Sequence, residues 1–512
     1  MNGAESLART LVACGLDTCF ANPGTSEMHF VSALDRVAGL HCVLGLAETV
    51  VTGAADGYGR MAKRPAATLL HCAPGLANGI ANLHNAKRAF TPIVNIAGDH
   101  ATYHRQYDSP LTGDTEGIAR GVSCWLRVSA SAKEVAADGA AAVQAARSAP
   151  GGIATLVLPA DTAWNEGSGP ATPLAVPARA KVSPQRVREA ATALRSGAPA
   201  MLLLAGVALG EEGLMAAHRI AAATGARLST PTQVARMARG RGRPSVDRVP
   251  YVVDRALAYL GGLKHMILCG SKPPVAFFAY PGKPSLTAPP DCVLHPLATV
   301  EEDVVGALEM LADELGAPRN PPIAQVAKPE TQRGPFQPEA FGLTLGALMP
   351  ENAVVCEEGA TSGRALFPVT WGAAPHDWLQ LTGGAIGHGL ACAAGAAVAA
   401  RDRKIIALQS DGGAMYQIQA LWTQAREKLD VVNVIFANRR YAILQGELAA
   451  VGAKPGPAAN ELFDLTRPEL NYVTMAAGMG VEGVRVENLE GFADTFRAAC
   501  GRRGPVLIEF LI

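Results

Sequence analysis

The stretch that decides the fold is SDGGAMYQIQALWTQAREKLDVVNVIFANRRYAIL, residues 410–444. It follows a short apolar strand at Ile405–Gln409 and opens with a tight Ser-Asp-Gly-Gly turn. Apolar residues then recur at helical spacing from Gly413 to about Glu427, and Val431–Phe436 is typical of a second apolar strand. A strand, a helix and a strand in this order predict a right-handed parallel βαβ unit.

Asp411 and Asn438 stand at the ends of these two strands. In a parallel unit both strands end at the same edge of the sheet, where open α/β sheets bind ligands. A carboxylate, an amide oxygen and a helix N-terminus together suit Mg²⁺ that bridges a diphosphate. The alternative is an ordinary Asp-Gly turn and an Asn at a strand end, both of which are common in loops.

The same stretch resembles the diphosphate-binding signature of thiamine-diphosphate (ThDP) enzymes, which runs Gly-Asp-Gly and later Asn-Asn. Ser410 replaces the first Gly and Ala437 replaces the first Asn, but neither change removes a side-chain ligand. The resemblance implies Mg²⁺ ligands and a diphosphate turn at these positions: Asp411, Asn438 and the backbone carbonyl of Arg440 for the metal, and Gly412 and Gly413 for the cofactor.

Composition limits the other classes of function. The 512 residues carry 45 basic and 45 acidic side chains, so balanced charge gives no reason to expect a nucleic-acid or membrane partner. The N-terminus lacks a signal pattern, and the longest small-apolar run, 389–400, is too short to span a bilayer. Ten cysteines without CxxC spacing predict reduced core thiols in a cytoplasmic protein.

Helical stretches alternate with short apolar strands in three blocks that Pro-rich linkers separate. This alternation predicts an α/β fold with three doubly wound, mostly parallel-sheet domains. The expected boundaries are residues 1–165, 183–316 and 339–512. By the resemblance these are a pyrimidine-binding, a middle and a diphosphate-binding domain.

Glu48 lies in LGLAETVVTGAADGYGR, residues 44–60. A Glu at a helix start is commonly a partner of the helix dipole. The string, however, resembles the ThDP-enzyme segment in which a catalytic Glu precedes Asp-Gly-Tyr, here Asp56-Gly57-Tyr58. The resemblance implies that Glu48 hydrogen-bonds N1′ of the aminopyrimidine. The cofactor then holds the base that removes its own C2 proton, and the protein tunes it.

The run LTGGAIGHGLACAAGAAVA, residues 381–399, resembles the segment that props the bent cofactor. Ile386 falls at the propping position, and the carbonyl of Gly384 would accept from the 4′-amino group. Without the other motifs Ile386 would be a core residue in a Gly-rich turn. Thr361 and Ser362 are candidate diphosphate donors or an N-cap of the next helix.

Two loops of the first block resemble those of benzoylformate decarboxylase: ANPGTSEMHF, residues 21–30, and LLHCAPGLANGIANLHNA, residues 69–86. The resemblance assigns a substrate-binding hydroxyl to Thr25 and proton transfer to His71, although a lone His at a strand end is often structural. A second family histidine has no match, because the corresponding stretch PPVAFFAYPG offers Phe277 and Phe278. The chain then needs another proton donor or a different end to the reaction.

Within the third block, the run from Gly383 through Tyr441 looks like acetolactate synthase large subunits. The hypothesis is therefore ThDP- and Mg²⁺-dependent decarboxylation of a 2-oxoacid. It would end either in carboligation, as in acetolactate synthase, or in aldehyde release, as in benzoylformate decarboxylase. FAD is possible, but no residue pattern supports it. In the family the Glu at the Glu48 position completes the site of a neighbouring subunit, which implies a homodimer or homotetramer.

Two other classes stay open. A ThDP-fold protein that binds or regulates without catalysis is compatible with Ser410 and Ala437, although an intact Glu48 argues against it. A nicotinamide dehydrogenase is a weaker alternative, because no GxGxxG follows a strand with an acidic residue on the next.

Overall fold

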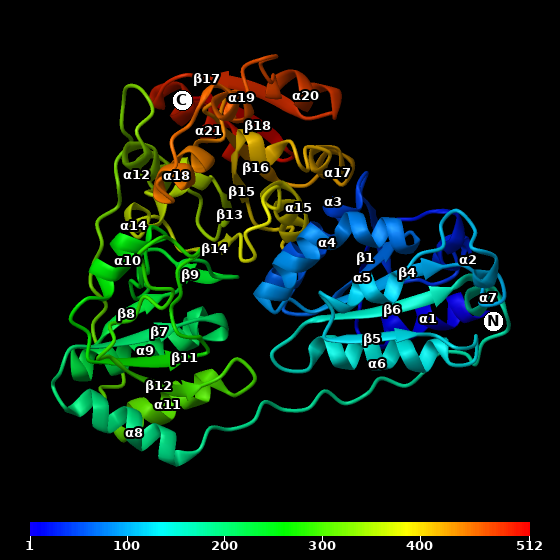
Figure 1. Ribbon diagram of the computed structural model, residues 1–512, viewed down its shortest axis with the longest axis horizontal. Helices are drawn as coiled ribbons and strands as arrows, with labels where there is room; N and C mark the ends of the chain where they lie inside the picture. Colours follow the sequence, from blue (N-terminus) through cyan, green and yellow to red (C-terminus); the bar gives the residue numbers. More distant parts are fainter.

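The computed structural model describes residues 1–512, and its strands form three sheets (Figure 1). The first sheet has the order β2-β1-β3-β4-β6-β5, and all its pairings are parallel. Its strands are β1 (Thr18–Asn22), β2 (His41–Leu44), β3 (Ala66–Leu70), β4 (Ile93–Asp99), β5 (Trp125–Val128) and β6 (Ile153–Pro159). The helices of this part are α1 (Gly3–Ala13), α2 (Met28–Leu34), α3 (Glu48–Ala62), α4 (Cys72–Ala89), α5 (Thr115–Arg120), α6 (Val135–Arg147) and α7 (Ala160–Trp164), with the 3₁₀ turns η1 (Thr25–Glu27) and η2 (Arg105–Tyr107).

The second sheet has the order β10-β8-β7-β11-β12 and is also parallel throughout. Its strands are β7 (Ala200–Leu204), β8 (Arg227–Thr230), β10 (Asp247–Arg248), β11 (His265–Cys269) and β12 (Val293–Ala298). Around it lie α8 (Pro184–Arg195), η3 (Gly206–Leu209), α9 (Glu211–Thr224), α10 (Val253–Leu260) and α11 (Val304–Glu314).

The third sheet has the order β17-β18-β16-β15-β13-β14-β9, and only the edge strand β9 (Met237–Arg239), which comes from the middle part of the chain, pairs antiparallel. The other strands are β13 (Val354–Glu358), β14 (His376–Gln380), β15 (Ile405–Ser410), β16 (Val431–Ala437), β17 (Glu482–Val486) and β18 (Val506–Leu511). Its helices are α12 (Pro338–Leu348), α13 (Ala360–Gly363), α14 (Leu366–Val369), α15 (Gly389–Ala399), α16 (Asp411–Ala414), α17 (Ala420–Arg426), α18 (Ala442–Ala450), α19 (Pro457–Phe463), α20 (Tyr472–Gly478) and α21 (Leu489–Cys500).

The prediction of three mostly parallel α/β sheets is confirmed, while the domain boundaries given above stay predictions. One predicted element is wrong. The single helix expected from Gly413 to about Glu427 is two short helices, α16 and α17, with a turn between them. Met415 and Tyr416 in that turn are 37% and 54% exposed, so no continuous apolar face exists there to hold one helix.

Two composition-based expectations can be compared with the structure. All ten cysteines are free thiols and most are buried, although Cys124 is exposed. None of the helices combines the length and the apolar character that crossing a membrane requires.

Helix α3 of the first domain packs against α15 of the third, and small residues set the spacing. A Cβ added at Gly57 would overlap the backbone of Cys392, and one added at Gly395 would overlap the backbone of Ala54. The two helix backbones therefore lie too close for larger side chains at these positions. This contact joins the two domains directly.

A buried charge network crosses the same interface. Asp56 on α3 is fully buried and accepts hydrogen bonds from Arg60 at 2.6 and 2.8 Å, from Thr91 at 2.5 Å, and from His388 Nε2 at 2.8 Å. Arg60 also donates to the carbonyl of Gln380 at 2.6 Å. Burial opposes the charge on Asp56, but Arg60 and His388 lower its pKa to about 2.

His388 immediately precedes α15 and is 2% exposed. Burial lowers its pKa, but the sulfur of Cys392 and the carboxylate of Asp56 act in the opposite direction and raise it to about 9. The direction of this shift favours the protonated ring, and its bond to Asp56 connects the two domains.

We expect His388→Asn to remove a pH dependence of stability. The folded-state pKa of about 9 lies above the ordinary 6.5, so the stabilisation is complete below pH 6.5 and is lost as pH rises through 9. Calorimetric melting temperatures from pH 6 to about 9.5 should fall for the wild type. The melting temperature of His388→Asn should decrease less over this pH range. His104 is exposed, so His104→Asn should show the same decrease as the wild type. An unchanged slope in His388→Asn would contradict this assignment.

Candidate active site

The first group of predicted residues surrounds Asp411, which follows β15 and begins α16. Its carboxylate is 3% exposed and accepts hydrogen bonds from the backbone N–H of Gly412 at 2.8 Å and of Arg439 at 2.5 Å. The hydroxyl of Tyr472 donates to its carbonyl at 2.7 Å. Burial raises the pKa of Asp411 against these hydrogen bonds. A bound cation would relieve the cost of that buried charge.

Asn438 lies beside Asp411, directly after the neighbouring strand β16. Its Oδ1 accepts from the N–H of Arg440 at 3.0 Å, and the Arg440 carbonyl accepts from the N–H of Ala442 at 3.0 Å. Arg439 between them has a φ of +58°, a strained left-handed conformation often found at functional loops. The three oxygen types match the hard donors that Mg²⁺ takes. We call residues 438–440 the metal loop.

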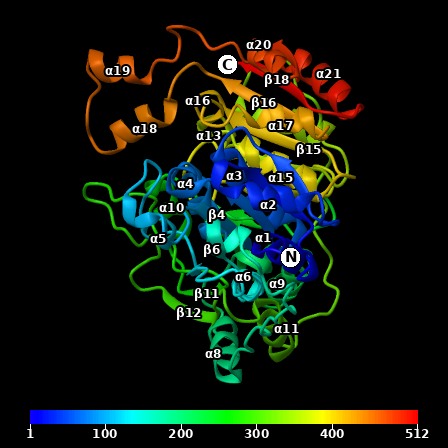
Figure 2. The same ribbon diagram turned by 90° about the vertical axis from the view of Figure 1, so that its right-hand side faces the viewer.

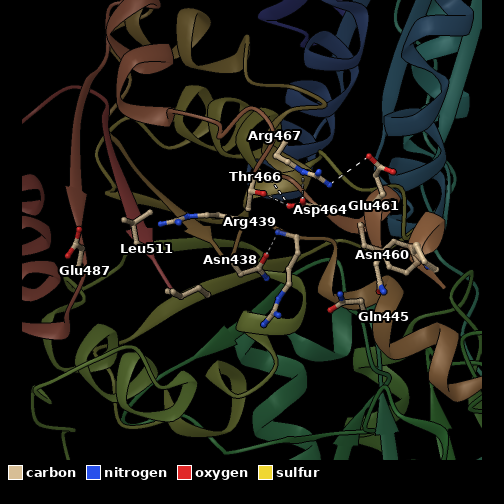
Figure 3. A pocket seen from close by; sticks show the side chains of 14 residues that line it. Asn438, Arg439, Gln445, Asn460, Glu461, Asp464, Thr466, Arg467, Glu487 and Leu511 are labelled. Carbon is tan, nitrogen blue, oxygen red and sulfur yellow. Dashed lines mark hydrogen bonds and ion pairs between the residues drawn. The ribbon is translucent and has the colours of Figure 1, made fainter. Parts of the chain in front are cut away.

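A cleft of about 1080 Å³ opens beside the metal loop (Figure 3). All three residues of the loop line it, together with residues of α19 and the segment that follows. Figure 3 shows Asn438 and Arg439 on one side and Asn460 and Glu461 on the other. Two of the three predicted metal ligands, Asn438 and Arg440, therefore border an open space that a ligand could enter.

Glycines bring backbone segments close together around Asp411. A Cβ at Gly412 would overlap the ring of Tyr441, and one at Gly413 would lie 2.6 Å from Gln409 Nε2. A Cβ at Gly387 would overlap Tyr416, with the carbonyl of Gly413 3.3 Å away. The Gly-rich segment before α15 thus lies against α16, which places the predicted propping residues next to the predicted diphosphate turn.

Glu358, at the end of β13, was not found by sequence reasoning. It is 4% exposed and accepts hydrogen bonds from the N–H groups of Gly387 at 2.5 Å and Gly389 at 2.7 Å. Burial raises the pKa of Glu358, against the effect of these bonds. Its carboxylate fixes the segment that carries Ile386, which is half-buried, and Gly384, which has a φ of +76°. The acidic pair in CEEG at the end of an apolar strand was the available signal.

Thr361 and Ser362 lie in α13, at the same edge of the sheet. Ser362 is buried, Thr361 is half-buried, and the preceding Ala360 has a φ of +47°. The strained residue turns the chain directly from β13 into this short helix. The structure therefore gathers all the cofactor and metal residues predicted in the third domain at the carboxyl ends of β13 to β16.

The second group lies in the first domain, where Glu48 is the first residue of α3. Its side chain is half-buried, and its Oε2 accepts from Asn78 Nδ2 of α4 at 3.2 Å. A Cβ at Gly75 would lie 3.2 Å from Oε1. Both neighbours belong to α4, so within one chain the polar contacts of Glu48 stay inside the first domain.

His71 directly precedes α4 and pairs with a carboxylate that sequence reasoning missed. Its Nδ1 lies 2.9 Å from Oε2 of Glu27, whose side chain is fully buried. The same oxygen accepts from the N–H of Gly24 at 2.7 Å, and the Ser26 hydroxyl donates to the other oxygen. A Cβ at Gly98 would overlap this carboxylate. Glu27 lies three residues after Gly24 in the quoted loop, close to the exposed Thr25.

Glu27, His71 and Cys72 place three possible metal-ligand atoms within 4.8 Å of one another. The hydroxyl of Ser26, however, lies 3.1 Å from His71 Nδ1 and 3.2 Å from Cys72 Sγ, and it also donates to Glu27. Because that oxygen bonds to all three groups, it fills the position between them. The cluster is therefore a hydrogen-bond network that orients the imidazole.

Comparison with known families identifies the chain. Residues 1–119 match the model of the thiamine pyrophosphate enzyme N-terminal TPP binding domain, and residues 362–510 match that of the C-terminal TPP binding domain. A Mycobacterium tuberculosis protein named "Putative acetolactate synthase large subunit IlvX" is 50% identical and aligns with 100% of this chain and 99% of its own length. The chain therefore belongs to the thiamine pyrophosphate enzyme family.

More distant relatives cover almost the whole chain as well. Benzoylformate decarboxylase of Pseudomonas aeruginosa is 27% identical over 97% of this chain and 96% of its own. The solved 4-hydroxybenzoylformate decarboxylase of Rhodococcus jostii matches with a TM-score of 0.86, at 24% identity, over 99% of this chain and 98% of its own. The latter similarity establishes the three-domain fold.

We expect Glu27 to fix the tautomer of His71. When the Glu27 carboxylate accepts the Nδ1–H, Nε2 of the neutral ring stays free for proton exchange. Nitrogen NMR of histidine-labelled protein without cofactor should show one fixed tautomer for His71 in the wild type. Glu27→Leu should show a mixture, and Ser32→Ala on the exposed side of α2 should match the wild type. A fixed tautomer in Glu27→Leu would contradict this role.

Proposed function

We propose that the protein is a ThDP- and Mg²⁺-dependent enzyme that decarboxylates a 2-oxoacid. The observation that supports the proposal is that one chain of this family carries both sets of residues that such a site would need. A half-buried carboxylate begins α3, and an oxygen-donor pair, Asp411 and Asn438, ends two neighbouring strands. When bound, the cofactor would supply a nucleophilic carbon for the substrate ketone and a thiazolium ring that accepts the electrons left when carbon dioxide leaves.

The residues of the third domain would hold this cofactor. Asp411, Asn438 and the Arg440 carbonyl would bind Mg²⁺, and the turn at Gly412 and Gly413 would lie against the diphosphate. Thr361 and Ser362 would donate to the same phosphates from α13. Ile386 would support the bent cofactor, and the Gly384 carbonyl would accept from its amino group. A Cβ at Gly412 or Gly413 would overlap Tyr441 or Gln409, so only glycine fits at this turn.

The first domain would supply the acid–base groups. Glu48 would hydrogen-bond the aminopyrimidine and tune its basicity, Thr25 would bind the substrate, and His71 would move a proton through Nε2. Since the contacts of Glu48 within one chain stay in the first domain, we propose that it serves the third domain of a second subunit. The assembly would be a homodimer or homotetramer.

The product depends on whether the decarboxylated substrate is protonated or attacks a second carbonyl compound. Phe277 packs on Gly384, where a Cβ would lie 2.8 Å from its ring, and a phenyl ring cannot donate a proton. This favours carboligation with a second carbonyl compound, the activity in the name of the 50% identical relative. His71 is the remaining donor for aldehyde release, the activity of benzoylformate decarboxylases.

We expect Glu48→Gln to lower turnover by at least about 100-fold, because it removes the carboxylate that tunes the base. Thiamine diphosphate should still bind, as followed by equilibrium dialysis. Activity is measured as carbon dioxide release from aliphatic and aromatic 2-oxoacids, with product analysis to separate aldehyde from carboligation product. Turnover equal to that of the wild type would remove this role for Glu48. A wild type that releases no carbon dioxide from any of these 2-oxoacids would instead favour a non-catalytic binding protein.

We expect Asp411→Ala to lose Mg²⁺-dependent retention of thiamine diphosphate. Mixing this inactive variant with inactive Glu48→Gln and allowing subunits to exchange should restore activity. Hybrid dimers then contain one site with an intact Glu48 and an intact Asp411. A mixture that stays inactive despite measured subunit exchange would contradict the shared site, and normal retention in Asp411→Ala would contradict the metal assignment.

A further inference from the structure

A cluster outside the proposed site joins the middle domain to the segment after the metal loop. The carboxylate of Glu447, on α18, accepts a hydrogen bond from the hydroxyl of Tyr251 at 3.0 Å and another from that of Tyr280 at 2.9 Å. Tyr251 precedes α10, and Tyr280 lies between β11 and β12. We call these three residues the tyrosine clamp. It connects two domains through one carboxylate.

The clamp holds an arm, residues 441–463, that contains α18 and α19. The base of the arm is closed by backbone hydrogen bonds from Tyr441 to Phe463 and from Leu465 to Arg439, both 2.9 Å. No residue of either helix is buried, and Figure 2 shows both helices projecting from the side of the molecule. Because the arm has no core of its own, individual side-chain contacts such as the clamp determine its position.

The base of the arm is continuous with the metal loop. Arg439 pairs with Leu465 at the base, and its own N–H donates to the Asp411 carboxylate at 2.5 Å. A displacement of α18 would therefore move the backbone that holds Asp411 and carries the Arg440 carbonyl. The position of the arm and the geometry of the metal loop are coupled through the chain itself.

Tyr251 also contacts neighbours of the other predicted cofactor elements. Its ring lies 4.9 Å from the guanidinium carbon of Arg364, which directly follows α13, and 5.2 Å from the ring of Phe277. Phe277 in turn packs against Gly384. Tyr251 therefore contacts the arm through Glu447 and also contacts Arg364 and Phe277. Arg364 follows α13, and Phe277 packs on Gly384, the predicted acceptor of the cofactor's amino group.

Both tyrosines remain hydrogen-bond donors at physiological pH. Burial and the neighbouring Glu447 raise the pKa of Tyr280 to about 12, and the same causes raise that of Tyr251. Each hydroxyl therefore keeps its proton and donates to a charged carboxylate. Such charge-assisted bonds are stronger than those between neutral groups.

We propose that Tyr251 and Tyr280 are positioning residues that hold α18 through Glu447 and thereby fix the metal loop against Asp411. The middle domain then takes part in forming the cofactor site, although the two matching family models, over 1–119 and 362–510, leave both tyrosines out. The identity of the cofactor rests on the proposed function, whereas the mechanical role of the clamp does not.

Hydrogen–deuterium exchange of the full chain without cofactor tests the mechanical part. In the double variant Tyr251→Phe, Tyr280→Phe, we expect the α18 amides to exchange about tenfold faster, because both bonds to a charged group are lost. The amides of β16 should be unchanged. Tyr103→Phe is the matched control, since Tyr103 is 60% exposed and outside the clamp. If the double variant is too unstable to purify, Tyr280→Phe alone should show a smaller acceleration confined to α18.

Unchanged exchange in α18, or equal acceleration in α18 and β16, would overturn the proposal. The second measurement is the Mg²⁺ concentration that gives half-maximal retention of thiamine diphosphate, which should rise several-fold in the double variant. Faster exchange with an unchanged Mg²⁺ requirement would overturn the link to the metal loop. Absence of thiamine diphosphate binding in the wild type would instead contradict the proposed function, and the exchange result would still decide the clamp.

Discussion

The buried ion network of Asp56, Arg60 and His388 is the constraint on which the arrangement of the domains depends. Its charges lie between α3 and α15, where water cannot solvate them, so each requires its partner. The two helices it joins have predicted site residues at their N-terminal ends. Glu48 begins α3, and the Gly-rich segment with Ile386 leads into α15. One interaction therefore fixes the orientation of two elements of the proposed site.

Backbone N–H groups hold three buried carboxylates at the edges of the sheets, and the differences between them are informative. Glu358 is bound to two N–H groups of the Gly-rich segment and acts as a structural anchor. The Glu27 carboxylate accepts hydrogen bonds from the N–H of Gly24 and the hydroxyl of Ser26, and it orients the imidazole of His71 through Nδ1. Asp411 also accepts two N–H groups, but it lies next to the metal loop, which borders an open cleft. Only this third arrangement suits an added cation.

The middle domain makes direct contacts with both of the other domains. Its strand β9 extends the third sheet, and Arg236 beside that strand binds Asp377 at 2.8 Å and the carbonyl of Arg60 at 3.0 Å. The same domain provides both tyrosines that hold Glu447. These contacts are spread over the chain without a short motif. This explains how a domain without a recognisable signature can take part in forming a site.

The sequence by itself determined the three α/β domains and the residues at the strand ends, because strand–helix alternation and loop motifs are local features. Asp411 and Asn438 stand out from such patterns, whereas Glu48 was singled out by its resemblance to a ThDP-enzyme segment. Only the tertiary structure revealed the pairing of Glu27 with His71, the anchoring by Glu358 and the clamp on Glu447, since each joins residues from separate elements. The break between α16 and α17 also depended on tertiary structure, because Met415 was apolar in sequence but exposed in the fold. Contacts between distant residues are set by packing, which no local pattern encodes.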